Sequence, residues 1–323
     1  MGRYPFMTAA NRLLRDTAGF YAASTQAERE RKFRRIQKAL MSLLKDKKIS
    51  TMNPQKMTEK DVCEFIIWCK HRLDASTASK YLRFLGEVLQ YVGNNAVERV
   101  KVTKRGLLPI ATPKSIQIVP GENLDQLMAG LWELEDEWWD AVGKAALTLY
   151  LHTGMRPSEL RTARLKDLDL SRLEIVVSNP KGKRRWANSE EKAPIMACAE
   201  ECIRKYLKRR TEALEKTGLD AREVEPLFPY ITKKGHVGYW NESAWRRLKF
   251  QIEQASGIRF KWKDLRPTFA QKAKDLGAPI EAVSKCMRHT STRTTELYYA
   301  RIRSDTAFSL VRQAWEAPTV KIL

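Results

Sequence analysis

Cationic groups, an imidazole and two phenols stand close together near the C-terminus of the chain. They are Lys263 and Arg266, then His289, then the adjacent Tyr298 and Tyr299. An arginine fork can bind two phosphate oxygens at once, and a tyrosine activated by nearby positive charge can act as a nucleophile. The spacing therefore indicates a phosphate clamp beside a nucleophile, with a merely basic helical surface as the alternative.

Breaking a phosphodiester requires neutralised phosphoryl oxygens, a nucleophile and a proton donor for the leaving oxygen. Metal-dependent nucleases meet the first need with clustered carboxylates that hold divalent ions. The residues from 261 to 301 are poor in carboxylates and rich in Lys and Arg. We therefore expect arginines to carry the charge and expect no metal or other cofactor.

Four blocks of the sequence resemble motifs of the tyrosine recombinase (phage integrase) family. Residues 152–160 read HTGMRPSEL and resemble TGxRxSEL, and residues 263–270 read KDLRPTFA and resemble HxLRHTFA. Residues 287–289 read MRH, followed by TTELY, and resemble LGH followed by TTxxY. Residues 180–185 read PKGKRR and resemble the hairpin GKGxKxR. The four blocks occur in the family's order. Residues 58–92 also resemble, as a weaker signal, the family's helical core-binding domain, so the resemblance covers both halves of the chain.

The resemblance implies a site-specific DNA recombinase or integrase that cuts and rejoins strands through a 3′-phosphotyrosine, without metal or ATP. Arg156 and Arg266 would clamp the scissile phosphate. The family's nucleophile follows the histidine by nine residues, which selects Tyr298 rather than Tyr299, counted from His289. A type IB topoisomerase, a transposase of the same chemistry and a non-catalytic helical DNA-binding protein are the alternatives.

The resemblance also implies the supporting roles. Lys181 would protonate the departing 5′ oxygen, with Lys183 as the other candidate. Lys263 and His289 would hydrogen-bond the phosphate and help transfer protons, and Glu159 would orient the first arginine.

Two positions depart from the family pattern in a way that bears on backbone structure. Pro267 stands where His or Arg is common and removes a backbone donor, and Arg288 stands where Gly is usual. Arg288 is therefore expected to cause strain or altered packing.

The composition favours a polyanionic partner. Lys and Arg number 59 against 38 Asp and Glu, a formal charge of +21 in 323 residues. This excess repels itself in a compact fold, so double-stranded DNA is the expected partner and a membrane surface the second choice. The five cysteines show no disulfide framework and no apolar run is long enough to cross a bilayer, so we expect a cytoplasmic, nucleoid-associated or otherwise intracellular protein.

Hydrophobic periodicity predicts a mainly α fold with a small antiparallel β-sheet in the C-terminal domain. We expect a helical core-binding domain over residues 1–110, a linker over 111–120 and a catalytic domain over 121–323. Helices are predicted over 27–48, from 59 with Thr58 and Asp61 as a capping box, and from 75. The candidate DNA contacts lie on a helix face, at the hairpin tip and on a second helix: Ser76, Ser79, Lys80, Arg83, Lys183, Arg246 and Arg247.

The sheet is expected from one strand over 173–177, a basic turn from residue 179 to 185 and a return strand near 193–195. Residues 194–196 should lead into a helix that runs through residue 207, and residues 231–241 should form a loop or turn. A short amphipathic helix after residue 303 is expected to dock on a neighbouring subunit, giving a tetramer on two DNA sites with a dimer at each site. Packing of this tail on its own domain is the alternative.

Overall fold

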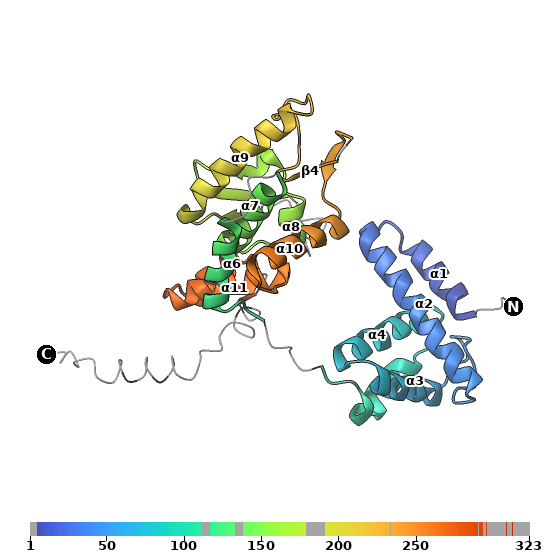
Figure 1. Cartoon of the computed structure of the whole chain (residues 1–323). Coiled ribbons are helices and arrows are strands. Elements are labelled where there is room, and N and C mark those ends of the chain that lie inside the picture. The colour runs from blue at the N-terminus through green and yellow to red at the C-terminus, as the bar shows by residue number, and fades with distance from the viewer. Residues whose placement is uncertain are drawn as a thin grey trace. The chain divides into compact units, whose positions relative to one another are not determined.

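A computed structural model describes residues 5–111, 117–132, 138–178, 191–232, 234–289 and 291–292, and residues 295, 308 and 312. The chain divides into two compact units, Met1–Lys114 and Ser115–Leu323 (Figure 1). Each unit has a buried hydrophobic core of its own. The described chain contains no helix long and apolar enough to span a membrane.

The first unit is helical. Its helices are α1 (Pro5–Asp16), α2 (Ala23–Lys45), α3 (Glu59–Arg72), α4 (Ala75–Tyr91) and α5 (Ala96–Thr103), followed by the 3₁₀ turn η1 (Arg105–Leu107). The predicted capping box opens α3: Thr58 N–H donates to Asp61 Oδ2 at 2.8 Å, and Asp61 N–H donates to Thr58 Oγ1 at 3.3 Å. Helix α5 was not predicted, although Val97 and Val100 complete the core.

The second unit is built around helix α7 (Trp138–Thr153), which is buried along most of its length. It packs against α9 (Glu200–Glu215) and α11 (Trp262–Asp275). The other helices are α6 (Gly121–Trp132), α8 (Pro157–Arg161), α10 (Glu242–Ser256) and α12 (Ile280–Cys286), with 3₁₀ turns η2 (Leu165–Asp167) and η3 (Ala197–Ala199). The candidate site is supplied by the ends of α7 and α12, the start of α8 and the first half of α11.

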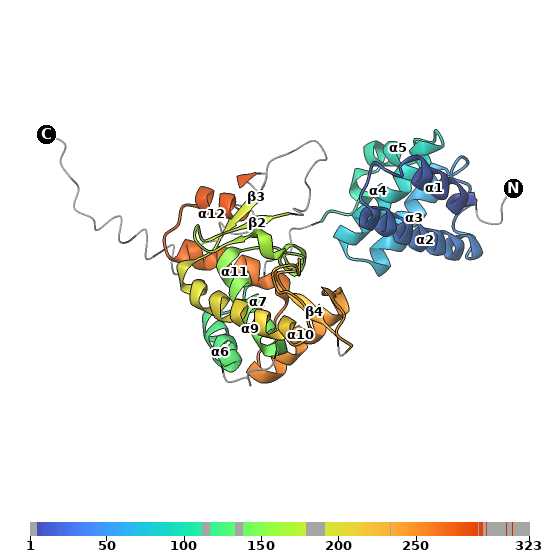
Figure 2. The ribbon, with the colours of Figure 1, turned by 90° about the horizontal axis from the view of Figure 1, so that it is seen from above.

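A three-stranded antiparallel sheet has the order β1 (Leu168–Asp169), β2 (Glu174–Val177), β3 (Glu191–Pro194) (Figure 2). The predicted pairing of β2 with β3 is confirmed, with Ile175 opposite Ala193. The predicted basic tip, including Lys181 and Lys183, lies outside the described residues.

Two local predictions differ from the structure. The strands β4 (Pro229–Ile231) and β5 (Val237–Tyr239) pair antiparallel and overlap the region where we expected a loop or turn. Packing explains the difference, because Tyr230 and Trp240 contact Trp139 edge-on. Residues 194–196 lead into η3 and then α9, and α9 continues to Glu215, beyond the predicted end at residue 207. The N–H of Ile195 still bonds to Leu173 O at 2.7 Å.

Of the predicted linker, residues 111 and 117–120 have no regular structure, and residues 112–116 lie outside the described part. The predicted tail helix also lies outside it, apart from the exposed Phe308 and Arg312.

Candidate active site

The turn between α7 and α8 places Arg156. Thr153 ends α7, where its buried hydroxyl donates to Leu149 O at 2.6 Å and accepts from Met155 N–H at 3.2 Å. Gly154 then has a φ of 62°, and a Cβ at this position would lie 2.6 Å from Cδ1 of Phe269. Glycine is required here on both counts, since side chains disfavour this φ and no space exists for one.

Glu159 fixes both the backbone and the side chain of Arg156. The N–H of Arg156 donates to Glu159 Oε2 at 2.9 Å, and its Nη1 donates to Oε1 at 2.6 Å. The Arg156 side chain is 24% exposed and the Glu159 side chain is fully buried. The carboxylate therefore holds this guanidinium at the surface of the site.

Glu159 is ionised although it is buried. Burial alone would raise the pKa of its carboxyl, but the Arg156 N–H and the charges of Arg288 and Arg156 outweigh burial and hold the pKa below its usual value. A second arginine contributes directly, because Arg288 Nη2 donates to Glu159 Oε2 at 2.6 Å.

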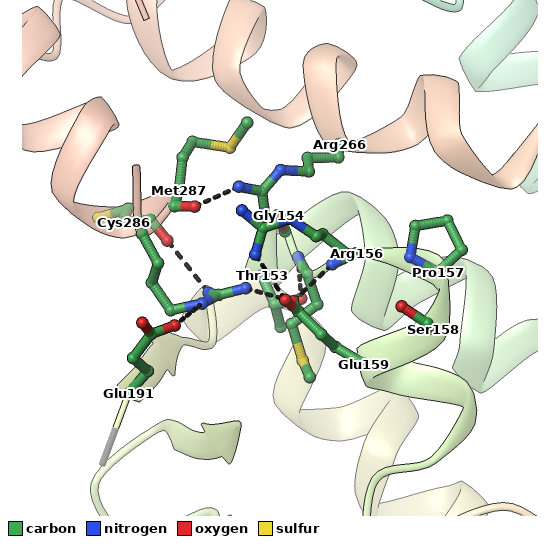
Figure 3. A network of polar contacts seen from close by, with 12 residues as sticks. Thr153, Gly154, Arg156, Pro157, Ser158, Glu159, Glu191, Arg266, Cys286 and Met287 are labelled. Atoms are coloured by element: carbon green, nitrogen blue, oxygen red, sulfur yellow. Dashed lines mark hydrogen bonds and ion pairs between the residues drawn. The ribbon is translucent and has the colours of Figure 1, made fainter. Parts of the chain in front are cut away.

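Arg266 reaches the same turn from α11. Its Nη1 donates to Gly154 O at 2.6 Å, and its Nη2 donates to Met287 O. Figure 3 shows the guanidinium groups of Arg156 and Arg266 and the carboxylate of Glu159 converging between α8 and α11. Two carbonyl acceptors on different segments fix the plane of the Arg266 fork, so residues 112 positions apart in sequence are joined.

Pro267 lies inside α11, five residues after its first residue, and not in the first turn where a proline fits without loss. It removes the backbone N–H that would have bonded to the Lys263 carbonyl. The helix continues to Asp275, because Leu265 and Ala270 are fully buried and the Thr268 hydroxyl accepts the N–H of Val119 at 2.9 Å.

Helix α12 ends at the third motif in a Schellman turn. The N–H of His289 bonds to Ser284 O at 3.2 Å, and that of Arg288 bonds to Lys285 O at 2.9 Å. Arg288 has a φ of 52°, in the left-handed region that this turn requires and glycine normally fills. The expected strain is therefore confirmed, at a cost of about 1 kcal/mol for a residue with a Cβ.

His289 lies in a positively charged environment. Its Nδ1 is 2.8 Å from Oγ1 of the fully buried Thr295. Desolvation first, and then the charges of Arg266, Arg156 and Arg288, lower the pKa of His289 to about 4. The imidazole is therefore neutral at pH 7, so one ring nitrogen can donate a hydrogen bond and the other can accept one.

The depressed pKa predicts a pH-dependent contribution of His289 to folding stability. The usual value is 6.5 and the folded value about 4, so the unfolded chain binds the proton more readily. The contribution is therefore present above pH 6.5 and is lost as the pH falls toward 4. Urea unfolding of the wild type and of His289→Gln, compared between pH 7 and 4.5, should show the wild type losing stability faster. Parallel curves would contradict the assignment.

The remaining predicted catalytic residues are placed only in part. Lys263 lies one turn before Arg266 on α11 with an exposed side chain, and within the described residues the structure records no bond from its ammonium group to the arginine cluster. Lys181 and Tyr298 lie outside the described residues.

The candidate DNA contacts are surface groups. Ser79, Lys80 and Arg83 are exposed on α4 and Ser76 is half-buried on the same face, while Arg246 and Arg247 are exposed on α10. Arg83 pairs with Glu87 at 3.2 Å, and Arg246 pairs with Glu242 at 3.4 Å. Such exposed pairs are worth little, so these arginines can exchange a carboxylate for a phosphate at small cost.

Sequence reasoning missed three parts of the site. The carbonyls of Gly154 and Met287 hold Arg266, and Thr295 holds His289. Gly154 belongs to the block TG and Thr295 to the block TT. These motifs predicted the positions of the residues but not their contacts. Arg288 was noted only as a departure from the family pattern.

The sequence comparison decides the family. Residues 118–305, more than half of the chain, match the model of the phage integrase family. The chain belongs to the phage integrase family. Among its curated relatives is the tyrosine recombinase XerC of Natranaerobius thermophilus, 26% identical over 75% of this chain and 78% of the relative. XerC of Thermodesulfovibrio yellowstonii is 32% identical over 51% of this chain and 52% of its own length.

Solved structures show that this phage integrase family member shares the fold of DNA recombinases. The Tn1549 transposon integrase, in complex with a circular intermediate DNA, matches with a TM-score of 0.68 at 16% identity, over 96% of this chain and 99% of the other. The XerH site-specific recombinase bound to its difH substrate matches with a TM-score of 0.64 at 15% identity, over 95% and 84%. The predicted fold class, mainly α with small antiparallel sheets, is confirmed.

Proposed function

We propose that this tyrosine recombinase is a site-specific DNA recombinase that cleaves and rejoins strands through a 3′-phosphotyrosine, without metal or ATP. One observation carries the proposal. Arg156 and Arg266 come from segments far apart in sequence, and buried acceptors hold both of them around the turn between α7 and α8. The charges of both arginines also lower the pKa of His289. Fixed donors aimed at developing charge are what phosphoryl transfer requires of a protein.

In the proposed cleavage step, the phenolic oxygen of Tyr298 bonds to phosphorus as the bond to the 5′ oxygen breaks. The phenol gives up its proton to neutral His289 while Lys263 hydrogen-bonds the phosphate, and the departing oxygen takes a proton from Lys181. One phosphoester replaces another, so a 5′-hydroxyl can reverse the step without an energy source. Arg156 and Arg266 stabilise the charge on the two non-bridging oxygens throughout.

The proposed partner is double-stranded DNA, consistent with the excess of 59 Lys and Arg over 38 Asp and Glu. The relatives described above include proteins solved in complex with DNA. We propose the helical N-terminal unit as a core-binding domain whose α4 face, with Lys80 and Arg83, contacts phosphates. A dimer at each site and a tetramer on two sites would bring four strands together for exchange.

The proposal is tested with a pool of nicked duplexes that carry a randomised central segment. The nick lets the short fragment with the free 5′-hydroxyl dissociate, so religation is prevented and the cleaved product is trapped as an SDS-resistant protein–DNA adduct. We expect wild-type protein to form adducts at 3′ ends in the presence of EDTA and to enrich a defined sequence. Absence of any adduct, or an adduct that requires divalent metal, would contradict the proposal.

The enriched sequence then separates recombinase from topoisomerase. Two differently labelled duplexes that carry it should yield recombinant strands when they are mixed with the protein. Relaxation of a supercoiled plasmid without any exchange between duplexes would instead identify a type IB topoisomerase.

A further inference from the structure

Arg288 occupies a backbone conformation that favours glycine, yet its side chain is buried at the centre of the site. Its φ is 52° and its side chain is only 5% exposed. A backbone outlier that persists in a packed position points to a function for the side chain that the backbone alone does not need.

The guanidinium of Arg288 contacts three segments of the second unit. Nη2 donates to Glu159 Oε2 on α8 at 2.6 Å, and Nη1 donates to Cys286 O at the end of α12 at 3.2 Å. Nε lies 3.7 Å from Glu191 Oε2 at the start of β3. In Figure 3 the Glu191 carboxylate points toward the network from the side opposite Pro157 and Ser158.

Glu159 thereby serves two arginines at once. Its Oε1 accepts from Arg156 Nη1, and its Oε2 accepts from Arg156 N–H and from Arg288 Nη2. The Glu159 side chain is fully buried, and these two arginines are its ion-pair partners among the described contacts. Arg288 holds one oxygen, which leaves the other oriented toward the Arg156 side chain.

Arg288 also changes the charge balance of the network. With it, the cluster holds the guanidinium groups of Arg156, Arg266 and Arg288 and the carboxylates of Glu159 and Glu191, an excess of one positive charge. Without it, two arginines would face two carboxylates and the network would be neutral. A neutral network would attract a phosphate diester less well than a cationic one.

We propose that Arg288 is a positioning residue of the strand-cleavage site, which orients the Arg156 clamp through Glu159 and gives the clamp its net positive charge. It acts through Glu159 rather than on the DNA itself, and Glu191 and the Cys286 carbonyl hold it in place. The inference deepens the proposed recombinase function and rests on it.

The test measures single-turnover cleavage of the nicked duplex enriched by wild-type protein, together with DNA affinity by gel shift and the thermal unfolding midpoint. Arg288→Met keeps side-chain length and removes the charge, and Arg288→Lys keeps the charge. We expect Arg288→Met to cleave about 10- to 100-fold more slowly, the effect of a slightly misplaced reacting group. Arg288→Lys should recover part of that loss. The dissociation constant for DNA should change less than about threefold, well below a tenfold change.

A second pair of variants tests whether the Glu191 carboxylate holds Arg288 in place. Glu191→Gln should slow cleavage in the same direction as Arg288→Met, and the two changes together should cost less than the product of their separate effects. The matched control is Glu174→Gln on β2 of the same sheet, whose carboxylate pairs with Lys192 at 2.9 Å and not with an arginine of the site. It should leave the cleavage rate unchanged.

The outcomes distinguish the two proposals. Adduct formation by wild type with Arg288→Met within twofold of it would overturn the role of Arg288 and leave the recombinase function standing. Equal losses in Arg288→Met and Arg288→Lys, accompanied by equal falls in unfolding midpoint, would show a packing role only and also overturn it. If Arg288→Met does not fold, Arg288→Gly relaxes the backbone and is expected to show the same loss of cleavage. No adduct with wild type overturns the recombinase function and this inference together.

Discussion

Tyr298→Phe is expected to abolish the SDS-resistant protein–DNA adduct, a fall of more than about 10⁴-fold in cleavage of the nicked duplex. The substitution removes one oxygen and keeps the ring, so folding and DNA affinity should be preserved. The effect is large because the phenolic oxygen is the atom that bonds to phosphorus, and the arginine clamp cannot supply a nucleophile. The measurement is the fraction of labelled DNA that stays attached to protein in an SDS gel.

Tyr299→Phe is the matched control, since it makes the same chemical change one residue later. We expect its adduct yield to stay close to that of wild type. The choice follows from the nine-residue step after His289, and Thr295, bonded to that imidazole, already ties this segment to the site. Loss of the adduct in Tyr299→Phe and not in Tyr298→Phe would transfer the nucleophile to Tyr299.

The sequence predicted those features of the fold that depend on neighbours along the chain. The capping box of Thr58 and Asp61 needs residues three apart. The helix predicted from residue 75 begins there, and the Asp74 carboxylate accepts the N–H of Thr77. The β2–β3 hairpin was likewise readable, because two apolar segments flank a basic turn.

Features that depend on packing between segments distant in sequence could not be predicted from local sequence patterns. The hairpin of β4 and β5 forms where Tyr230 and Trp240 meet Trp139, roughly ninety residues or more upstream. No local periodicity in residues 231–241 records that contact. The sequence therefore predicts a loop or turn without the paired strands, because tertiary packing decides the state of so short a strand.

In the candidate site, too, local motifs identified residues but not the contacts between distant segments. Motifs named Arg156, Arg266, His289 and Glu159, and the structure brings all four together. The motifs could not show which atoms hold the arginines. Arg288 and Glu159 are 129 residues apart, and the expected strain at Arg288 gave no indication of an ion pair. A departure from a family pattern was thus the better guide to a chain-specific contact than the pattern itself.

Arg266→Lys should slow strand cleavage by about 10²- to 10³-fold, comparable to the loss of one preorganised donor at a developing charge. Lysine keeps the positive charge but offers a single nitrogen. It cannot donate to Gly154 O and Met287 O and still present a planar fork to two phosphate oxygens. The loss should appear in the cleavage rate under single-turnover conditions, while DNA affinity, shared among many surface cations, changes little.

Arg172→Lys provides the matched control, because it makes the same substitution on a side chain that is 72% exposed and pairs only loosely with Asp169 at 3.8 Å. It should cleave at the wild-type rate. The Arg266 position is 7% exposed, so the unfolding midpoint of Arg266→Lys must be measured with its rate. A slow variant that remains folded at the assay temperature and binds DNA normally locates the defect in the chemical step. An Arg266→Lys protein that cleaves within threefold of wild type would show that charge alone suffices, and the fixed fork would then have no part in the reaction.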